Sequence, residues 1–351
     1  MSYTPSTIVS CPNFQVSLDS IYDLDAAKFY AEPIPFTEYL RSPINRNGMS
    51  ARIAPGDAKV RTVELTYTPR LLESAVSSNV ANTCTASTVR GNTSTDYTID
   101  TSQNLSVEEL ITLDSLKSGC ESNAVYLQEK VMHMMAILDR KVNIKNATQA
   151  AALLGGWASN TGSIPFVTLN GTNLEVQTLQ PSSAFAPFPS TFQSLRRAGT
   201  ISNLGQFVVA GGLQLDSYIE QIKDGCCADY GLDVGAIQAR YGLASIYDNA
   251  IADAAGGDEF SWAIANGALQ VIEYNKWQGV FALSDSNESY GTIVSPATGI
   301  AYDLFMGHSC GSISMSLTAT TKLVALPADM YQTGDRLEGV NGFAQIEVVN
   351  V

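Results

Sequence analysis

Residues 307–311, Gly-His-Ser-Cys-Gly, match the G-x-S-x-G pattern of a serine nucleophile elbow. In that motif a sharp strand-to-helix turn exposes the serine hydroxyl, and a histidine later in the chain accepts its proton. The only two histidines of the chain are His133 and His308, and neither follows Ser309. Residues 312–320 also alternate as in a strand. We therefore predict a tight turn between two strands, with glycine supplying the dihedral angles, and not a nucleophile.

A cluster of carboxylates surrounds the Gly-Gly pair at 256–257 and could supply oxygen ligands to a calcium ion. Its members are Asp248, Asp253, Asp258 and Glu259. Their spacing does not fit an EF-hand loop, which places its ligands at fixed alternate positions. An acidic surface loop is the preferred interpretation.

His133 is the other residue type suited to metal binding, and its nearest ligand candidates are Cys120 and Glu129. No zinc-type spacing joins them, so we predict a packed or solvent-edge histidine. Neither the GxxxxGK[ST] phosphate loop nor the GxGxxG loop occurs in the chain. We therefore expect a protein that is not an enzyme, with no catalytic residue, no cofactor and no metal ion.

Basic residues are concentrated in one stretch, residues 41–70, which we call the basic window. It contains Arg41, Arg46, Arg52, Lys59, Arg61 and Arg70. The window contains two acidic residues, Asp57 and Glu64, so its net charge is +4. The net charge of the whole chain is −14, which leaves a net charge of −18 on the residues outside the window. Opposite charge on separate parts of one chain suits self-association, because a basic segment of one copy can dock on the acidic body of the next. An ordinary solvated loop is the alternative.

Composition favours a folded protein that hides surface in an assembly. The chain has 351 residues, 45% of them hydrophobic, and only 15% are charged, below the usual quarter. Interface cores are depleted in charge in the same way. The acidic balance disfavours nucleic-acid recognition, which needs a dominant basic face. The first residues predict no signal peptide, no apolar run has transmembrane length, and the six scattered cysteines are expected to be reduced.

The residues discussed above lie in segments whose sequence patterns are in part extended and in part helical. Residues 1–45 are expected to form an irregular arm, punctuated by proline and anchored by aromatic side chains. Residues 46–105 should be extended, with a strand at Val60–Tyr67 in a long hairpin that reaches away from the body. Ser106-Val-Glu-Glu109 fits a capping box and predicts a helix start.

The strongest helix signal covers residues 120–142. Its apolar stripe is formed by Ala124, Leu127, Val131, Met134, Met135 and Leu138. A second, short helix is expected over residues 146–154, stopped by the Gly-Gly pair that follows. Residues 205–222 predict a strand, a turn and a helix, and residues 342–351 predict a closing strand. The fold class is therefore α+β.

This order of parts resembles the major capsid protein of tailed double-stranded DNA phages, the Hong Kong 97-type fold. The phrases Phe-Val-Val-Ala-Gly-Gly at 207–212 and Asn-Gly-Ala-Leu-Gln-Val-Ile-Glu-Tyr-Asn at 266–275 are similar to capsid proteins of this type. The resemblance implies a division into five segments: an N-terminal arm at 1–45, an extended loop at 46–105, a peripheral domain with a spine helix at 106–194, an axial α/β domain at 195–305, and a return to the peripheral domain at 306–351.

The resemblance also implies a function. We expect a structural subunit that self-assembles, through hexamers and pentamers, into an icosahedral capsid enclosing double-stranded DNA without sequence-specific binding. Its expected partners are copies of itself and portal, scaffold or decoration proteins, with no membrane; its expected location is the virion, after synthesis in the host cytoplasm. The alternatives are another phage or surface assembly protein, such as a tail, sheath or nanocompartment shell component, and, less favoured, a serine hydrolase using Ser309.

Overall fold

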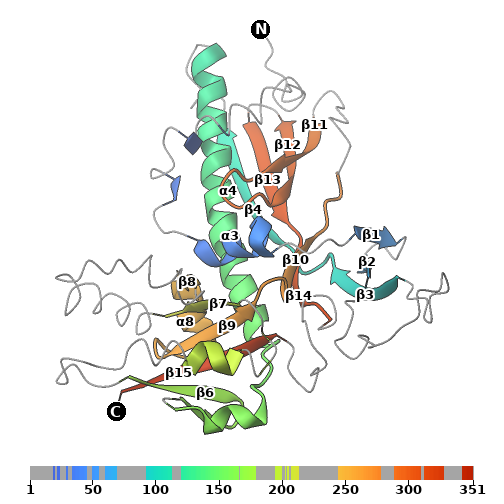
Figure 1. Cartoon of the computed structure of the whole chain (residues 1–351). Helices are drawn as coiled ribbons and strands as arrows, with labels where there is room; N and C mark the ends of the chain where they lie inside the picture. Colours follow the sequence, from blue (N-terminus) through green and yellow to red (C-terminus); the bar gives the residue numbers. More distant parts are fainter. Residues whose placement is uncertain are drawn as a thin grey trace.

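The computed structural model places one long helix beside several β-sheets (Figure 1). The residues that it describes are 19, 22–23, 29–30, 34–45, 50–54, 60–68, 92–112, 120–165, 167–178, 194–199, 202, 204, 207–212, 244–277, 288–309, 312–327 and 342–350. Within these ranges the strands form sheets of three, two, four and six strands. The α+β class predicted from the sequence is confirmed.

The long helix α4 (Cys120–Ala151) has 32 residues and is about 48 Å long at 1.5 Å per residue. Its predicted apolar stripe is confirmed from Leu127 to Leu138, where the five stripe residues are buried; the Ala124 side chain lies outside the described set. The prediction of two helices is wrong. No glycine or proline occurs between residues 120 and 154, so nothing interrupts the hydrogen-bond ladder before Gly155.

Strand β4 (Leu105–Thr112) replaces the helix predicted to start at Ser106. The capping-box pattern is local, whereas this segment pairs along its whole length with β13 (Ser312–Ala319), about 200 residues later in the chain. Alternate residues also suit a strand, since Ile111 is buried while Glu108 and Leu110 are exposed. The alternating burial and the pairing with β13 therefore make this segment a strand, although its sequence fits a helix cap.

A four-stranded antiparallel sheet packs against α4, in the order β11 (Glu288–Val294), β12 (Ala301–Ser309), β13 and β4. Strand β13 alternates strictly, burying Ile313, Met315 and Leu317. These side chains share a buried cluster with the stripe of α4. Helix and sheet thus form two layers around one core (Figure 1).

A six-stranded mixed sheet lies beside the other end of α4 (Figure 1). Its order is β5 (Val167–Asn170), β6 (Asn173–Thr178), β15 (Phe343–Asn350), β9 (Phe260–Ala265), β7 (Phe207–Gly211) and β8 (Ala244–Tyr247). The predicted strands near 207 and at the C-terminus are confirmed. The helix predicted after β7 lies outside the described residues.

Shorter elements connect these layers. They are α3 (Pro35–Arg41), the 3-10 helices η1 (Pro43–Asn45) and η4 (Ser159–Ser163), α8 (Asn249–Ala255), and the antiparallel pair β10 (Leu269–Glu273) and β14 (Thr321–Ala325). No helix in the described part of the chain is both long enough and apolar enough to cross a membrane.

The extended segment forms a three-stranded antiparallel sheet of β1 (Ser50–Ala54), β2 (Val60–Tyr67) and β3 (Thr93–Asp100). The strand predicted at Val60–Tyr67 and its hairpin pairing are confirmed. However, the sheet does not simply project from the body, because Val63, Leu65 and Ile99 share a buried cluster with Trp157. We call this unit, at the right of Figure 1, the basic sheet because β1 and β2 belong to the basic window.

The five segment limits stay a prediction. The limit between 305 and 306 falls inside β12, and β15 lies between β6 and β9 in the six-stranded sheet. The two-, four- and six-stranded sheets therefore draw strands from more than one predicted segment, while β1, β2 and β3 all belong to the extended loop.

Candidate functional site

The N-terminal arm crosses α4 through a short helix that the sequence did not predict. Helix α3 has proline in its first turn, where the missing N–H costs nothing, and it ends at Ser42 before Pro43. Phe36, Tyr39 and Leu40 are buried, and the rings of Phe36 and Trp262 meet edge to face at 5.8 Å. The aromatic side chains of this part of the arm thus anchor it to its own subunit.

The first polar junction beneath the arm centres on Asp248 and Asn143, which are both buried. Asp248 caps α8 by accepting from Ala250 N at 2.9 Å, and it also accepts from Phe36 N at 3.1 Å and from Asn143 Nδ2 at 2.9 Å. Asn143 Oδ1 accepts from the backbone N–H and the hydroxyl of Thr37, at 3.0 and 2.7 Å. Asp248 is therefore a structural cap and not part of the predicted acidic surface loop.

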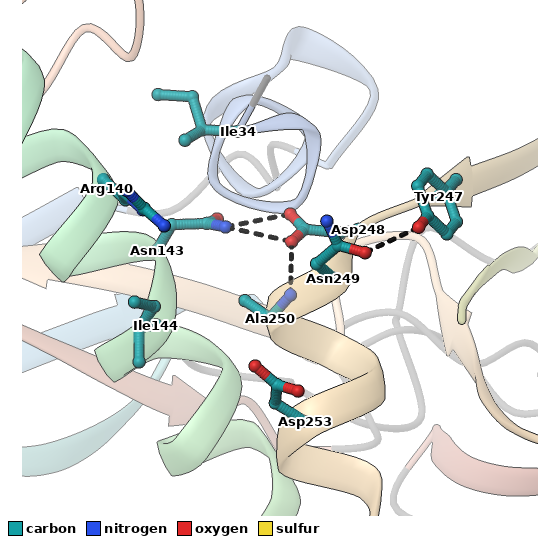
Figure 2. Close-up of a pocket in the computed structure, with 9 residues that line it drawn as sticks. All are labelled: Ile34, Arg140, Asn143, Ile144, Tyr247, Asp248, Asn249, Ala250 and Asp253. Carbon is teal, nitrogen blue, oxygen red and sulfur yellow. Dashed lines mark hydrogen bonds between the residues drawn. The ribbon is translucent and has the colours of Figure 1, made fainter. Parts of the chain in front are cut away.

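A small open pocket of about 140 Å³ adjoins this junction (Figure 2). Figure 2 shows the Asn143 amide pointing at the Asp248 carboxylate, with Ile34 on one side and Ile144 on the other. Its remaining lining residues are Arg140, Tyr247, Asn249, Ala250 and Asp253. Ligand pockets usually enclose about 300–1,000 Å³, so this hollow is too small for a typical cofactor.

The second polar junction centres on Asp139, which is fully buried on α4. Four hydroxyl groups donate to its carboxylate: Tyr30 at 2.7 Å, Ser295 at 2.7 Å, Thr298 at 2.8 Å, and Tyr302. Burial raises the pKa of the Asp139 carboxyl, and the hydroxyl donors oppose that rise. One carboxylate thus joins the arm, the long helix and the hairpin between β11 and β12.

Arg41 ties the arm to the same hairpin. Its guanidinium lies 2.7 Å from Glu273 and donates to Gly299 O at 2.8 Å, within the turn that also carries Ser295 and Thr298. We predicted Arg41 as an inter-subunit contact; the structure places it in contacts within its own subunit.

Two further residues of the basic window, Arg52 and Arg61, lie on strands of the basic sheet. Arg61 on β2 lies over the Tyr274 ring, 5.6 Å from its centre, in a cation–π contact. Arg52 on β1 stands opposite Glu64 in the β1–β2 register. Arg46, Lys59 and Arg70, and the side chain of Arg52, lie outside the described set. The inter-subunit role of these residues stays a prediction.

The motif around Ser309 is a strand–turn–strand unit. Ser309 ends β12 and pairs with Ser312 at the start of β13, so no helix follows the serine as a nucleophile elbow requires. His133 is exposed, and its ring lies edge-on to Phe29 at 4.8 Å, in agreement with a solvent-edge histidine. Among the described residues, no three His, Cys, Asp or Glu side chains converge on one point as metal ligands.

Sequence reasoning missed Asp139 and Asn143, although a signal for them exists. Asp139, Asn143 and Asn146 recur at spacings of four and three, directly beside the apolar stripe of α4. Polar residues that continue a buried helix face require polar partners from another element. That pattern predicts a covering segment, which the arm provides.

Comparison with solved structures gives alignments over most of the chain, at low identity. No family model and no curated protein matches the chain. A subunit in the capsid asymmetric unit of Cyanophage A-1(L) aligns with a TM-score of 0.46 and 10% identity, over 92% of this chain and 94% of that one. The mature capsid of bacteriophage PhiM1 gives 0.38 and 7%, over 83% and 82%, and the capsid of Cyanophage P-SCSP1u gives 0.36 and 10%, over 85% of each chain. All three solved structures are phage capsids.

Proposed function

We propose that this chain is the structural subunit of an icosahedral viral capsid that self-assembles, through hexamers and pentamers, around double-stranded DNA. The observation that carries the proposal is the arrangement around α4. One 32-residue helix lies against a four-stranded sheet near one end and a six-stranded sheet near the other, with the basic sheet to the side (Figure 1). An arm, an extended unit, a spine helix and two sheet regions are the parts that the resemblance to the Hong Kong 97-type fold implies.

The charge distribution supports the same function. The basic window carries +4 and the rest of the chain −18, so one copy offers both halves of a complementary contact. Such contacts steer association and fix its register. An acidic body also suits a container for DNA, because it repels the phosphate backbone. We propose the virion as the location, with synthesis in the host cytoplasm and with portal, scaffold or decoration proteins as further partners.

Expression of the chain followed by sedimentation and negative-stain microscopy tests this function. Closed hollow particles of megadalton mass are the expected result. Open tubes would instead favour a tail or sheath component, and a protein that stays monomeric at high concentration would overturn the proposal. Reaction of Ser309 with a fluorophosphonate probe would revive the hydrolase alternative, which the strand–turn–strand geometry disfavours.

A further inference from the structure

Large apolar side chains are exposed at four places in the described part of the chain: Leu110 at 67%, Ile137 at 52%, Ile144 at 41% and Val294 at 41%. Ile137 and Ile144 are seven residues apart on α4 and therefore share one face of the helix. Lys141 is exposed between them, with Arg140 beside it. We call Ile137, Lys141 and Ile144 the helix patch; it is apolar and basic.

Leu110 lies in a surface of opposite charge. Glu108 is exposed two residues before it, on the same face of β4, and we call this pair the strand patch. The strands β4, β11, β12 and β13 contain no lysine or arginine. Glu288 lies in the same cross-strand row as Leu110 and is exposed, whereas Glu109 faces α4 and pairs with Lys130. Glu108 and Glu288 therefore supply the acidic charge on the side of the sheet that carries Leu110.

The two patches lie on different surfaces of one subunit. Leu127, Val131 and Leu138 of α4 pack against the inner face of the four-stranded sheet, while the helix patch lies on the exposed flank of this stripe. On β4 the inward residue Ile111 belongs to the same core, and the alternation turns Leu110 away from α4. The helix and the sheet thus expose complementary surfaces that do not face each other within one subunit.

We infer that the helix patch of one copy docks on the strand patch of the next, in a head-to-tail contact. A symmetric contact of helix patch on helix patch would bring lysine against lysine, which like-charge repulsion disfavours. A head-to-tail contact brings Lys141 to Glu108 and covers Ile137 and Ile144 with Leu110. Such contacts close into rings when the rotation between copies permits. The inference deepens the proposed function, on which it rests, by naming one surface used in assembly.

Charge reversal tests this pairing. Lys141→Glu and Glu108→Lys should each lower the particle yield about tenfold or more, because each places like charges across the contact. The double variant Lys141→Glu/Glu108→Lys should recover the yield, since opposite charges then meet again at every head-to-tail contact in a ring of any size. Arg197→Glu and Asp258→Lys make the same charge changes at exposed positions elsewhere and should assemble normally. Normal particles from either single variant, or no recovery in the double variant, would overturn the inference.

Photo-cross-linking gives a second measurement that does not depend on particle formation. Replacing Ile137 by p-benzoylphenylalanine in the full chain should, at high protein concentration, produce an inter-chain cross-link that mass spectrometry maps to residues 105–112. A cross-link to another segment, or none between chains, would contradict the docking. If the wild-type chain forms no particles, the proposed function fails, while this map still decides the contact.

Discussion

The arm junctions and the basic sheet contain polar side chains in two different settings. At the junctions Asp139, Asn143 and Asp248 are buried, and their carboxylate and amide oxygens accept several hydrogen bonds each. On the basic sheet the described polar side chains mostly reach the surface, as at Asp96 and Thr98. A buried polar group that loses its hydrogen-bond partner costs free energy of folding, so such groups favour one conformation of the chain. Surface charges contribute little to folding and act mainly on association between copies. The two regions should therefore respond differently to mutation.

The largest effect is expected from Asp139→Ala. The change leaves the hydroxyls of Tyr30, Ser295, Thr298 and Tyr302 without their common acceptor. Each buried polar group left unsatisfied costs about 1–3 kcal/mol, so the free energy of unfolding should fall by more than about 3 kcal/mol. Urea unfolding followed by circular dichroism measures it. Asp96→Ala on exposed β3 is the matched control and should stay within about 0.5 kcal/mol; equal effects would erase the contrast between the regions.

A smaller loss is expected from Asn143→Ala. Thr37 then loses the acceptor of both its N–H and its hydroxyl, while Asp248 keeps its bonds from Phe36 and Ala250. We expect a cost of about 1–3 kcal/mol, with a greater rate of proteolytic cleavage in the arm. Thr148→Ala, at an exposed position of the same helix, serves as control. A variant with wild-type stability and cleavage would show that the arm is held without this bridge.

The junction should also make stability depend on pH. Burial raises the pKa of Asp139 in the folded state, so the folded chain holds this proton more tightly than the unfolded chain does. The stabilisation is complete below the ordinary aspartate pKa of about 4 and is lost as the pH rises through the folded-state value. Asp139 should therefore stabilise the folded chain less at neutral pH than in mild acid.

Asp139→Asn, which cannot ionise, isolates this contribution. The wild type should lose stability relative to the variant between about pH 4 and pH 7, in urea titrations at several pH values. Burial also raises the pKa of Glu38, and the nearby Asp139 charge raises it further, so the comparison with the variant cancels only the part that burial causes. A wild type that instead gained stability relative to the variant as the pH rose from about 4 to 7 would mean that the four hydroxyl donors outweigh burial.

The same contrast explains what could be predicted from the sequence. The strand at Val60–Tyr67 and the stripe of α4 follow local periodicities, which one segment displays by itself. The strand at Leu105–Thr112 was missed because its pairing with β13 is decided by residues far along the chain. The Asp139 junction was missed for the same reason, since its partners range from Tyr30 to Tyr302. Local patterns therefore predicted elements, while long-range polar contacts had to be seen in three dimensions.

The smallest effect on folding, with the largest contrast in assembly, is expected for charge reversal on the basic sheet. Arg61 stacks on Tyr274 of its own subunit, so Arg61→Glu should cost about 0.5–1 kcal/mol of stability in addition to any effect on assembly. Arg52→Glu places a second carboxylate opposite Glu64 across β1 and β2, so it should cost up to about 1 kcal/mol of stability. Because a shell repeats each contact in every subunit, we expect a much larger loss in particle yield than in melting temperature for Arg52→Glu.

Salt should weaken the wild-type assembly in parallel, because the Debye length shrinks to about 3 Å at 1 M. Sedimentation at low and high salt, with Arg52→Lys as the charge-conserving control, measures both effects. The variant that keeps the charge should assemble like the wild type unless the guanidinium fork itself binds a carboxylate, in which case lysine would restore only part of the yield. Normal particles from Arg52→Glu and Arg61→Glu together would mean that the basic window is a solvated surface, and the contact between subunits would then have to lie elsewhere.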